Sequence, residues 1–430
     1  MNNSTFSKRA FTSAFLALTL STLSACDFDI GKDGLTINED DSVRYVDAPG
    51  TTSPPAETAD CGGTTSGVNW GALLNENCPK LSDYNLFADS TDPTRNPNAG
   101  GIPYDLSTPL FTDYASKYRF VFIPEGEKAT YSEHEAFEFP VGTVLVKTFA
   151  MPADTANRGQ NETIIETRLL IHRENGWVAR PYYWDSEADA SLAIAGKSVE
   201  NMTTLHNGQT LTFTYAVPKA SSCTSCHSVV PLLQGSEDQR QPIFKPIGPK
   251  ARFLNKDFDY EGYIRNQLAY WEEQGVLEGL PESLSEVSKA PVFSNAMDPT
   301  LLSPEALHDA AKAYLDINCA HCHRSELTLP EPLYAGPAGS SGLQMEYNRN
   351  YEDDPTRFGT CKTPVAGGSP DYPLGDVVPG AADMSYLVFR MSTTDPRHKM
   401  PELGRSTVHA EGVALISEWI NQLPDAACSP

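Results

Sequence analysis

Two short segments of the chain have the residue types and spacing that attach a porphyrin covalently. Each reads C-x-x-C-H: Cys223-Thr224-Ser225-Cys226-His227, and Cys319-Ala320-His321-Cys322-His323. In this pattern the two thiols add across the vinyl groups of a haem, and the histidine after the second cysteine binds the iron from the proximal side. The sequence therefore predicts two covalently attached c-type haems, with His227 and His323 as iron ligands.

Two other sites use a C-x-x-C spacing. A thioredoxin-like redox pair is expected in a βαβ context and needs no histidine after the second cysteine. A zinc site with four cysteine ligands would use both cysteine pairs and would leave both histidines without a role. Haem attachment gives a role to all four cysteines and to the histidine that ends each motif, so we prefer it.

The second motif follows a predicted amphipathic helix. Ser303-Pro304-Glu305 supplies an N-cap, a proline at the first helical position and an early acid. The helix then runs to the motif with one apolar face, made by Leu307, Ala311, Tyr314 and Leu315. Another apolar helix is predicted within 406–423, capped by Ser406 or Thr407. Two such helices around a C-x-x-C-H motif resemble the class I cytochrome c fold, in which they pack across each other over the haem edge.

Met400 is the best candidate for the sixth ligand of the second iron. It lies in the segment HKMPELG (398–404), and the proline after it holds the backbone extended. It also precedes the last helix closely, as the axial methionine does in class I cytochromes. A thioether ligand raises the reduction potential relative to two histidines and leaves no open position on the iron.

Other methionines and histidines near this segment have simpler interpretations. Met384 and Met391 lie seven positions apart, a spacing that favours core packing. His398 and His409 are expected to be exposed. His321, between the two cysteines, is expected to point away from the second iron.

The sixth ligand of the first iron stays undecided from the sequence. Met297, Met202 and His206 are the candidates, and an iron with no sixth protein ligand is the fourth alternative. An open iron permits ligand binding or peroxide chemistry, whereas a six-coordinate iron is restricted to electron transfer. A helix is predicted after this motif, from about Tyr260 to Gln274, ended by Gly275.

The first residues have the features of an export and anchoring signal. Lys8 and Arg9 precede an uncharged, mostly apolar stretch that ends Leu23-Ser24-Ala25-Cys26. This ending resembles the lipobox of bacterial lipoproteins, which predicts lipidation of Cys26; cleavage of an ordinary signal peptide after Ala25 is the alternative. Lipid anchoring places the protein in a bacterial cell envelope, facing the periplasm, at the inner or the outer membrane. The acidic residues up to about Asp60 are predicted to be a solvated tether.

A β-rich region follows the tether. Period-two and β-branched or aromatic runs predict antiparallel strands in a sandwich or partial barrel, within 117–124, 136–152, 162–185 and 209–218. Cys61 and Cys78 are predicted to form a disulfide, and Cys361 and Cys428 either bridge or stay free. The aromatic cluster Trp177, Tyr182, Tyr183 and Trp184 either lines a ligand groove or, more commonly, packs in the core.

Length and charge limit the classes of function. The 430 residues are too many for one core. The predicted organisation is a multidomain α+β chain, in which an antiparallel β-rich, sandwich-like domain precedes mainly α-helical haem domains. The predicted segments are a signal peptide (1–25), a tether (26–60), the β-rich domain (61–220), the first haem segment (221–298) and a class I-like cytochrome domain (299–430). The 32 basic and 56 acidic residues give a net charge of −24, which argues against nucleic-acid binding and predicts salt-sensitive docking to a basic redox partner.

The region from about Leu81 to Leu423 resembles a family of bacterial di-haem c-type cytochrome lipoproteins. The resemblance rests on stretches such as FPVGTVLVKTF, VPKASSCTSCH, LNKDFDYEGYIRNQL, YLDINCAHCH and KMPELGR. The second half is also similar to cytochrome domains that accompany periplasmic quinoprotein dehydrogenases. The resemblance implies haem at both motifs and an axial role for Met400, and it implies no substrate.

Three hypotheses about function follow from these features. The first is a lipid-anchored carrier that passes electrons between periplasmic or membrane redox partners. The second is a haem enzyme, peroxidase-like or an oxidoreductase subunit, with an open site at the first iron. The third is a surface binding or assembly module in which the haems are structural.

Overall fold

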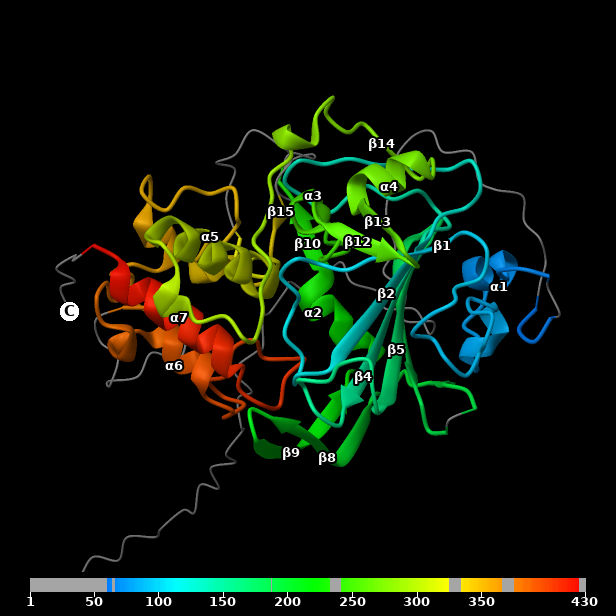
Figure 1. Cartoon of the computed structure of the whole chain (residues 1–430), viewed down its shortest axis with the longest axis horizontal. Coiled ribbons are helices and arrows are strands. Elements are labelled where there is room, and N and C mark those ends of the chain that lie inside the picture. The colour runs from blue at the N-terminus through cyan, green and yellow to red at the C-terminus, as the bar shows by residue number, and fades with distance from the viewer. Residues whose placement is uncertain are drawn as a thin grey trace, which may run out of the picture. The chain divides into compact units, whose positions relative to one another are not determined.

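A six-stranded antiparallel sheet dominates the first half of the chain (Figure 1). The computed structural model describes residues 60–63, 66–186, 188–232, 241–324, 334–365 and 375–424. The strand order is β1-β2-β4-β5-β6-β7. The bounds of these strands are Gly101–Pro103, Ser116–Phe122, Val144–Pro152, Glu162–Arg173, Gly176–Tyr183 and Ser191–Leu192.

The remaining strands form small sheets. The hairpin of β8 (Lys197–His206) and β9 (Gln209–Val217) forms a sheet of its own, and β3 (Ala129–Thr130) pairs in parallel with β14 (Leu277–Glu278). The other pairings are β12 with β13 (Asp257–Tyr260 and Tyr263–Asn266), and β10 with both β11 and β15 (Ser228–Pro231, Ile243–Phe244 and Tyr334–Ala335). The large sheet and the β8–β9 hairpin are antiparallel, as the sequence predicts, but the polar sequence of β8 was not recognised as a strand.

Each face of the large sheet packs in a different core, because neighbouring strand residues point to opposite sides. Phe120 and Phe122 lie in a core with residues 68–87, which include α1 (Trp70–Asn75) and the predicted Cys61–Cys78 disulfide. Val121 and Leu145 face the other core, which contains residues 244–290. Short helices, short strands and loops therefore cover most of the described sheet. No second large sheet packs on it among the described residues, so the predicted sandwich is wrong there; the β8–β9 hairpin packs at the end of β4 and β5.

The sheet face toward residues 244–290 changes from apolar to cationic along its strands. Arg119, Lys147 and Arg168 are cross-strand neighbours on β2, β4 and β5. Arg119 pairs with Asp105 and Arg168 with Glu166, but among the described residues no acid pairs with Lys147. Burial, followed by the adjacent cations, holds the pKa of Lys147 well below its ordinary value.

The predicted helix over 260–274 is wrong in its first half. Glu261 and Gly262 both have positive φ and turn the chain between β12 and β13, because a Tyr-Glu-Gly-Tyr sequence suits a two-residue hairpin turn. The helical part is α4 (Gln267–Glu273), where the side chain of Asn266 accepts a hydrogen bond from the Leu268 amide. Other short helices on this side of the chain are α2 (Thr224–His227) and α3 (Ala251–Leu254).

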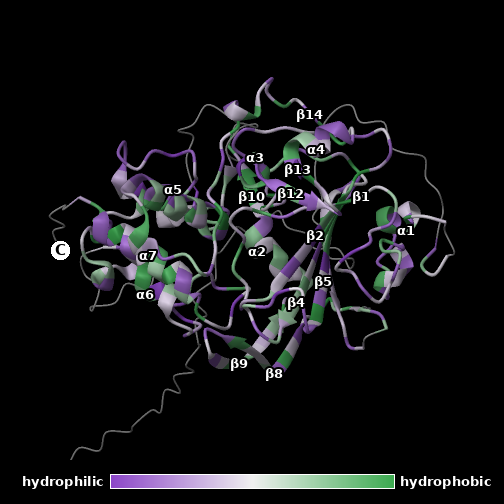
Figure 2. Cartoon of the chain, in the orientation of Figure 1, coloured by the Kyte–Doolittle hydropathy of each residue, from purple (hydrophilic) through white to green (hydrophobic). Residues whose placement is uncertain are grey.

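The last third of the described chain contains three packed helices, α5 (Pro304–Leu315), α6 (Tyr386–Ser392) and α7 (Ala410–Gln422) (Figure 1). Hydrophobic and hydrophilic residues alternate along α5 and α7 (Figure 2), and their apolar faces share a core that includes Leu315 and Trp419. Ser303 caps α5 as predicted. The expected caps of α7 are wrong: Ser406 and Thr407 donate to Asp113 instead, and the helix begins at Ala410.

The predicted β-rich domain and first haem segment share one core. Val121 and Leu145 pack in it with Phe253 and Trp271, and Ile317 joins from the second motif's helix. No helix among the described residues has the length and apolar character needed to cross a membrane. The predicted signal peptide, Cys26 and the tether before Asp60 lie outside the described residues.

Candidate haem sites

The second C-x-x-C-H motif begins in a wide helical turn. Helix α5 continues into a π-helical turn over Asp316–Ala320, which carries Cys319. The amides of Cys322 and His323 both donate to the carbonyl oxygen of Cys319, at 3.0 and 2.9 Å. The motif is therefore a compact turn that carries both thiols and the imidazole within five residues.

A pocket lies beside this motif. Its lining is mostly apolar, and it includes Cys319, His323 and Met400 together with Leu343, Leu387 and Val413. A mostly apolar wall with a few polar groups is typical of a cofactor site. The structure therefore brings together the two ligands that the sequence predicted for the second iron, from segments far apart in the chain.

His323 is oriented by a hydroxyl group. Its Nδ1 lies 2.9 Å from Oγ of Ser341, and that oxygen also accepts from the Leu343 amide at 3.2 Å. An imidazole whose Nδ1 donates a hydrogen bond has its Nε2 lone pair available for a metal. Burial lowers the pKa of His323 to about 4, so the ring is neutral.

The loop that carries Met400 is fixed by Arg405. This buried guanidinium donates to four backbone carbonyl oxygens, those of Met400, Thr407, Arg390 and Thr393, at 2.9–3.0 Å. The amide of Met400 also donates to the Arg390 carbonyl at 2.8 Å. Met400 is thus held against the end of α6 by hydrogen bonds to a charged group, which are stronger than neutral ones.

Two further methionines line the same cavity. Met391 was predicted to be core packing, and it is buried, but its side chain also contacts the cavity. Met345 was not considered in the sequence, although its amide donates to the His323 carbonyl at 3.1 Å and its side chain is buried in the cavity wall. Met384 does not line the cavity and is 37% exposed, so its predicted packing role is wrong.

His409 is buried, and the expectation that it is exposed is wrong. Its ring stacks on Phe111 at 4.2 Å between centroids, and its Nδ1 lies 2.9 Å from the Tyr314 hydroxyl. Burial lowers the pKa of His409 to about 3. Both His409 and Phe111 line the second cavity, so the β-rich region contributes to this site. His398 is half-buried rather than exposed.

The first C-x-x-C-H motif packs against the cationic end of the large sheet. Cys223 ends a 3₁₀ turn and His227 ends the short helix α2. Nδ1 of His227 donates to the Lys245 carbonyl at 2.7 Å, and its ring stacks on Phe244 at 4.8 Å. A carbonyl oxygen only accepts, so Nδ1 carries the proton and Nε2 is left as a metal ligand. Burial lowers the pKa of His227 to about 4.

The cavity beside His227 differs from the second one. It is smaller, and no methionine lines it among the described residues. Charged and phenolic side chains line it instead, namely Glu135, Lys245, Lys250, Arg324 and Tyr334. The first site therefore offers less space and a more polar wall than the second.

None of the three predicted sixth ligands lines this cavity. His206 is committed elsewhere, since Nδ1 contacts the Thr155 hydroxyl and Nε2 contacts Glu411, both at 2.8 Å. Met202 packs with the β8–β9 hairpin, and Met297 follows a turn closed by Ser294. The structure thus brings His227 together with none of these residues.

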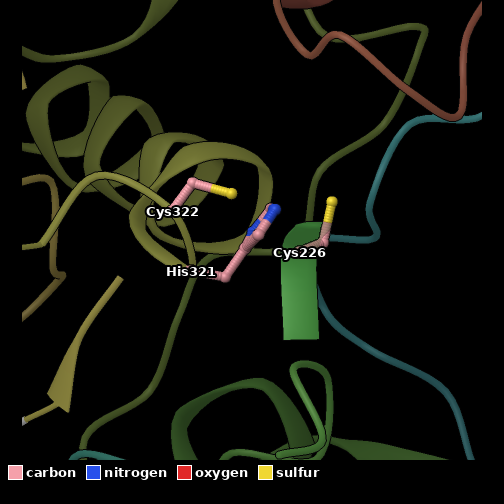
Figure 3. A group of neighbouring side chains, drawn as sticks. All are labelled: Cys226, His321 and Cys322. Atoms are coloured by element: carbon pink, nitrogen blue, oxygen red, sulfur yellow. The ribbon is translucent and has the colours of Figure 1, made fainter. Parts of the chain in front are cut away.

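The two motifs meet at their second cysteines. The ligand atoms of Cys226, His321 and Cys322 all lie within 4.8 Å of one another, and the imidazole of His321 points between the two sulfur atoms (Figure 3). The group contains neither Cys223 nor Cys319, so it is not the four-cysteine zinc site considered above. Sequence reasoning missed this contact because no local pattern relates the two motifs.

Buried ion pairs join the surroundings of the two motifs. Asp316, just before the second motif, accepts from Lys250 at 3.0 Å and from Arg252 at 2.9 Å. These cations hold its pKa at about 2, against the cost of burial. Arg324, just after the motif, donates to Glu135 at 3.0 Å, and this cation holds the pKa of Glu135 at about 2.

The remaining predicted site residues have structural roles or lie outside the described part. Trp177, Tyr182 and Trp184 are buried and Tyr183 is half-buried, which supports the packing interpretation. Cys361 is disulfide-bonded, and Cys428 lies outside the described residues. All four motif cysteines are free thiols in this structure.

The chain matches no known family profile, no curated protein sequence and no solved structure at a significant level. The two motifs and the geometry around them are therefore the features that point to a function.

Proposed function

We propose that this protein is a di-haem c-type cytochrome that transfers electrons between redox partners of a bacterial cell envelope. Haem would be bonded to Cys223 and Cys226 at the first site and to Cys319 and Cys322 at the second. His227 and His323 would bind the two irons, and Met400 would complete the second. A haem iron held in this way supplies one-electron transfer.

The observation that carries the proposal is the common cavity of His323 and Met400. The imidazole and the thioether come from opposite ends of the C-terminal segment, yet both line one apolar space beside Cys319. Ser341 orients the imidazole, and Arg405 fixes the loop of the methionine. These residues hold both proposed ligands in place, which would lower the rearrangement that accompanies a change of iron charge.

Mass spectrometry and spectroscopy test this proposal. The full chain would be produced in a bacterial host that matures c-type cytochromes and purified from its membranes. We expect a mass increase of two haems and an absorption spectrum typical of thioether-linked haem. Two double variants, Cys223→Ala/Cys226→Ala and Cys319→Ala/Cys322→Ala, should each lose one of the two haems. A colourless protein of unmodified mass would contradict the proposal.

A haem enzyme is the second candidate, and the polar first cavity favours it. No methionine lines that cavity among the described residues, and Tyr334, Lys245 and Lys250 could bind a small polar molecule there. Carbon monoxide titration of the reduced protein separates the two functions. Carbon monoxide binding to only one of the two haems favours an open first site. No binding favours an electron carrier in which both irons have six ligands.

The proposed partner is a protein with a basic surface. A net charge of −24 would accelerate its association at low ionic strength. We expect the rate of electron exchange with a basic cytochrome to fall as salt rises, since ions screen the attraction. A rate that does not depend on salt would remove the electrostatic part of the proposal.

A further inference from the structure

The two motifs contact each other through residues that are not predicted iron ligands. Cys226 and Cys322 are the second cysteines of their motifs, and each lies near the other and near His321. The Sγ atom of Cys322 is also 3.6 Å from the backbone oxygen of Ser225, inside the first motif. Two segments far apart in the chain therefore pack directly through their haem-attachment residues.

His321 is a buried side chain at this contact. Only 8% of it is exposed, and its Nδ1 has no hydrogen-bond partner among the described residues. A buried polar atom without a partner costs free energy, so its retention needs an explanation. The residue at the corresponding position of the first motif, Ser225, is exposed.

We propose that Cys226, His321 and Cys322 form a junction at which the two haem sites exchange electrons directly. This inference rests on the proposed function, because it needs a haem on each cysteine. Each sulfur atom would be joined through one carbon atom to the edge of its macrocycle, and the sulfur atoms lie within 4.8 Å of each other. The two sites would then behave as one coupled redox pair.

The proposed exchange involves one electron and no atoms. With haem bound at both sites, one iron would be oxidised while the other is reduced, so no proton donor or further reactant would be needed. We assign His321 a positioning role, since its ring points between the two sulfur atoms (Figure 3). It lies beside Cys226 and lines the first cavity together with His227.

Circular dichroism in the main haem absorption band tests the junction without an activity assay. Two haems in close contact couple their transitions and give a pair of bands of opposite sign, whereas distant haems give the sum of two independent spectra. We expect the paired bands in the protein with two haems. Redox titration of the same sample should give two midpoints whose values depend on each other.

Variants of the junction make the test specific. His321→Leu should reduce the amplitude of the paired bands and shift both midpoints, and His321→Gln, which keeps a polar nitrogen, should restore part of the effect. Ser225→Ala is the matched control, because it changes the exposed residue of the other motif and keeps the backbone oxygen that faces Cys322. It should leave both readouts unchanged.

The outcomes separate the junction from the proposed function. A sample with two haems, independent spectra and midpoints that His321→Leu leaves unchanged would overturn the junction and keep the di-haem cytochrome. Conversion of one haem from low to high spin by His321→Leu would make His321 an axial ligand, which also overturns the junction. A protein without haem would overturn both proposals.

Discussion

The same five-residue pattern occurs in two different surroundings in this molecule. The second motif follows a helix and faces a mostly apolar cavity, with the side chain of Met400 in its wall. The first motif packs against a β-sheet and faces a smaller cavity with charged walls. The comparison teaches that C-x-x-C-H determines how a haem is attached, while the elements around it determine which ligand, if any, completes the iron.

Loss of Met400 is the change that should most reduce the difference between the two sites. In Met400→Ala we expect the second haem to bind carbon monoxide and its reduction potential to fall by on the order of 0.1 V, because the thioether is lost. Spectroscopic titration measures both effects, with the exposed Met384→Ala as control. Met400→Ala could leave the potential and the carbon monoxide binding of the second haem unchanged while Met345→Ala or Met391→Ala changes them. That result would assign the ligand to another methionine of the cavity.

Asp316→Asn tests the ion pairs that connect the two sites. The substitution leaves Lys250 and Arg252 buried with a neutral partner, so the free energy of unfolding should fall by about 3–5 kcal/mol. Chemical denaturation at pH 7 measures the loss, and the exposed Asp298→Asn serves as a control. A loss below 1 kcal/mol would show that these pairs contribute no more than pairs on the surface.

Acid should weaken the buried ion pairs of Asp316 and Glu135. The pKa values of Asp316 and Glu135 are about 2 in the folded protein, below their ordinary values of 3.8 and 4.5. The unfolded state therefore binds protons more readily, and the stability from these groups is complete above about pH 4.5 and is lost as pH falls toward 2. Denaturation midpoints across this range test the sign. An Asp316→Asn/Glu135→Gln variant should show a shallower dependence on pH.

Lys147→Met probes the cationic sheet face beside the first site. It removes a charge that has cationic neighbours on both adjacent strands, so we expect stabilisation by about 1 kcal/mol. Lys128→Met, at an exposed position, should change stability by about 0.3 kcal/mol or less. Thermal denaturation of the protein with both haems compares the two. Destabilisation by Lys147→Met would mean that an anionic group, such as a haem carboxylate, pairs with this lysine.

Ser341→Ala should give the smallest effect and should act on the second site alone. Removal of the hydroxyl leaves Nδ1 of His323 without its acceptor, which makes the imidazole a weaker donor to iron(III). We expect the second midpoint potential to rise by on the order of 0.05 V. The first midpoint should move only as far as coupling between the sites allows. Redox titration measures both, and a fall in the second midpoint would contradict the assigned direction of the hydrogen bond.

The local sequence was sufficient for the motifs and for several of the elements that carry them. Ser303 and Pro304 predicted the start of α5, because capping and a fixed φ act within one turn. Alternating apolar residues predicted β2, β4, β5, β6 and β9, because successive side chains of a strand point to opposite faces of the sheet. The Cys61–Cys78 disulfide was also predicted, since two cysteines 17 positions apart can close a modest loop in an oxidising compartment.

The tertiary structure alone decided what surrounds those motifs. Met345, His409 and Phe111 enter the second cavity through contacts between distant segments, and His321 meets Cys226 in the same way. The hairpin at Glu261-Gly262 replaced half of a predicted helix because two positive φ angles turn the chain there. Spacing along a sequence reports which atoms one turn or strand presents, whereas a binding site also needs the opposite wall, and that wall is set by packing across the whole fold.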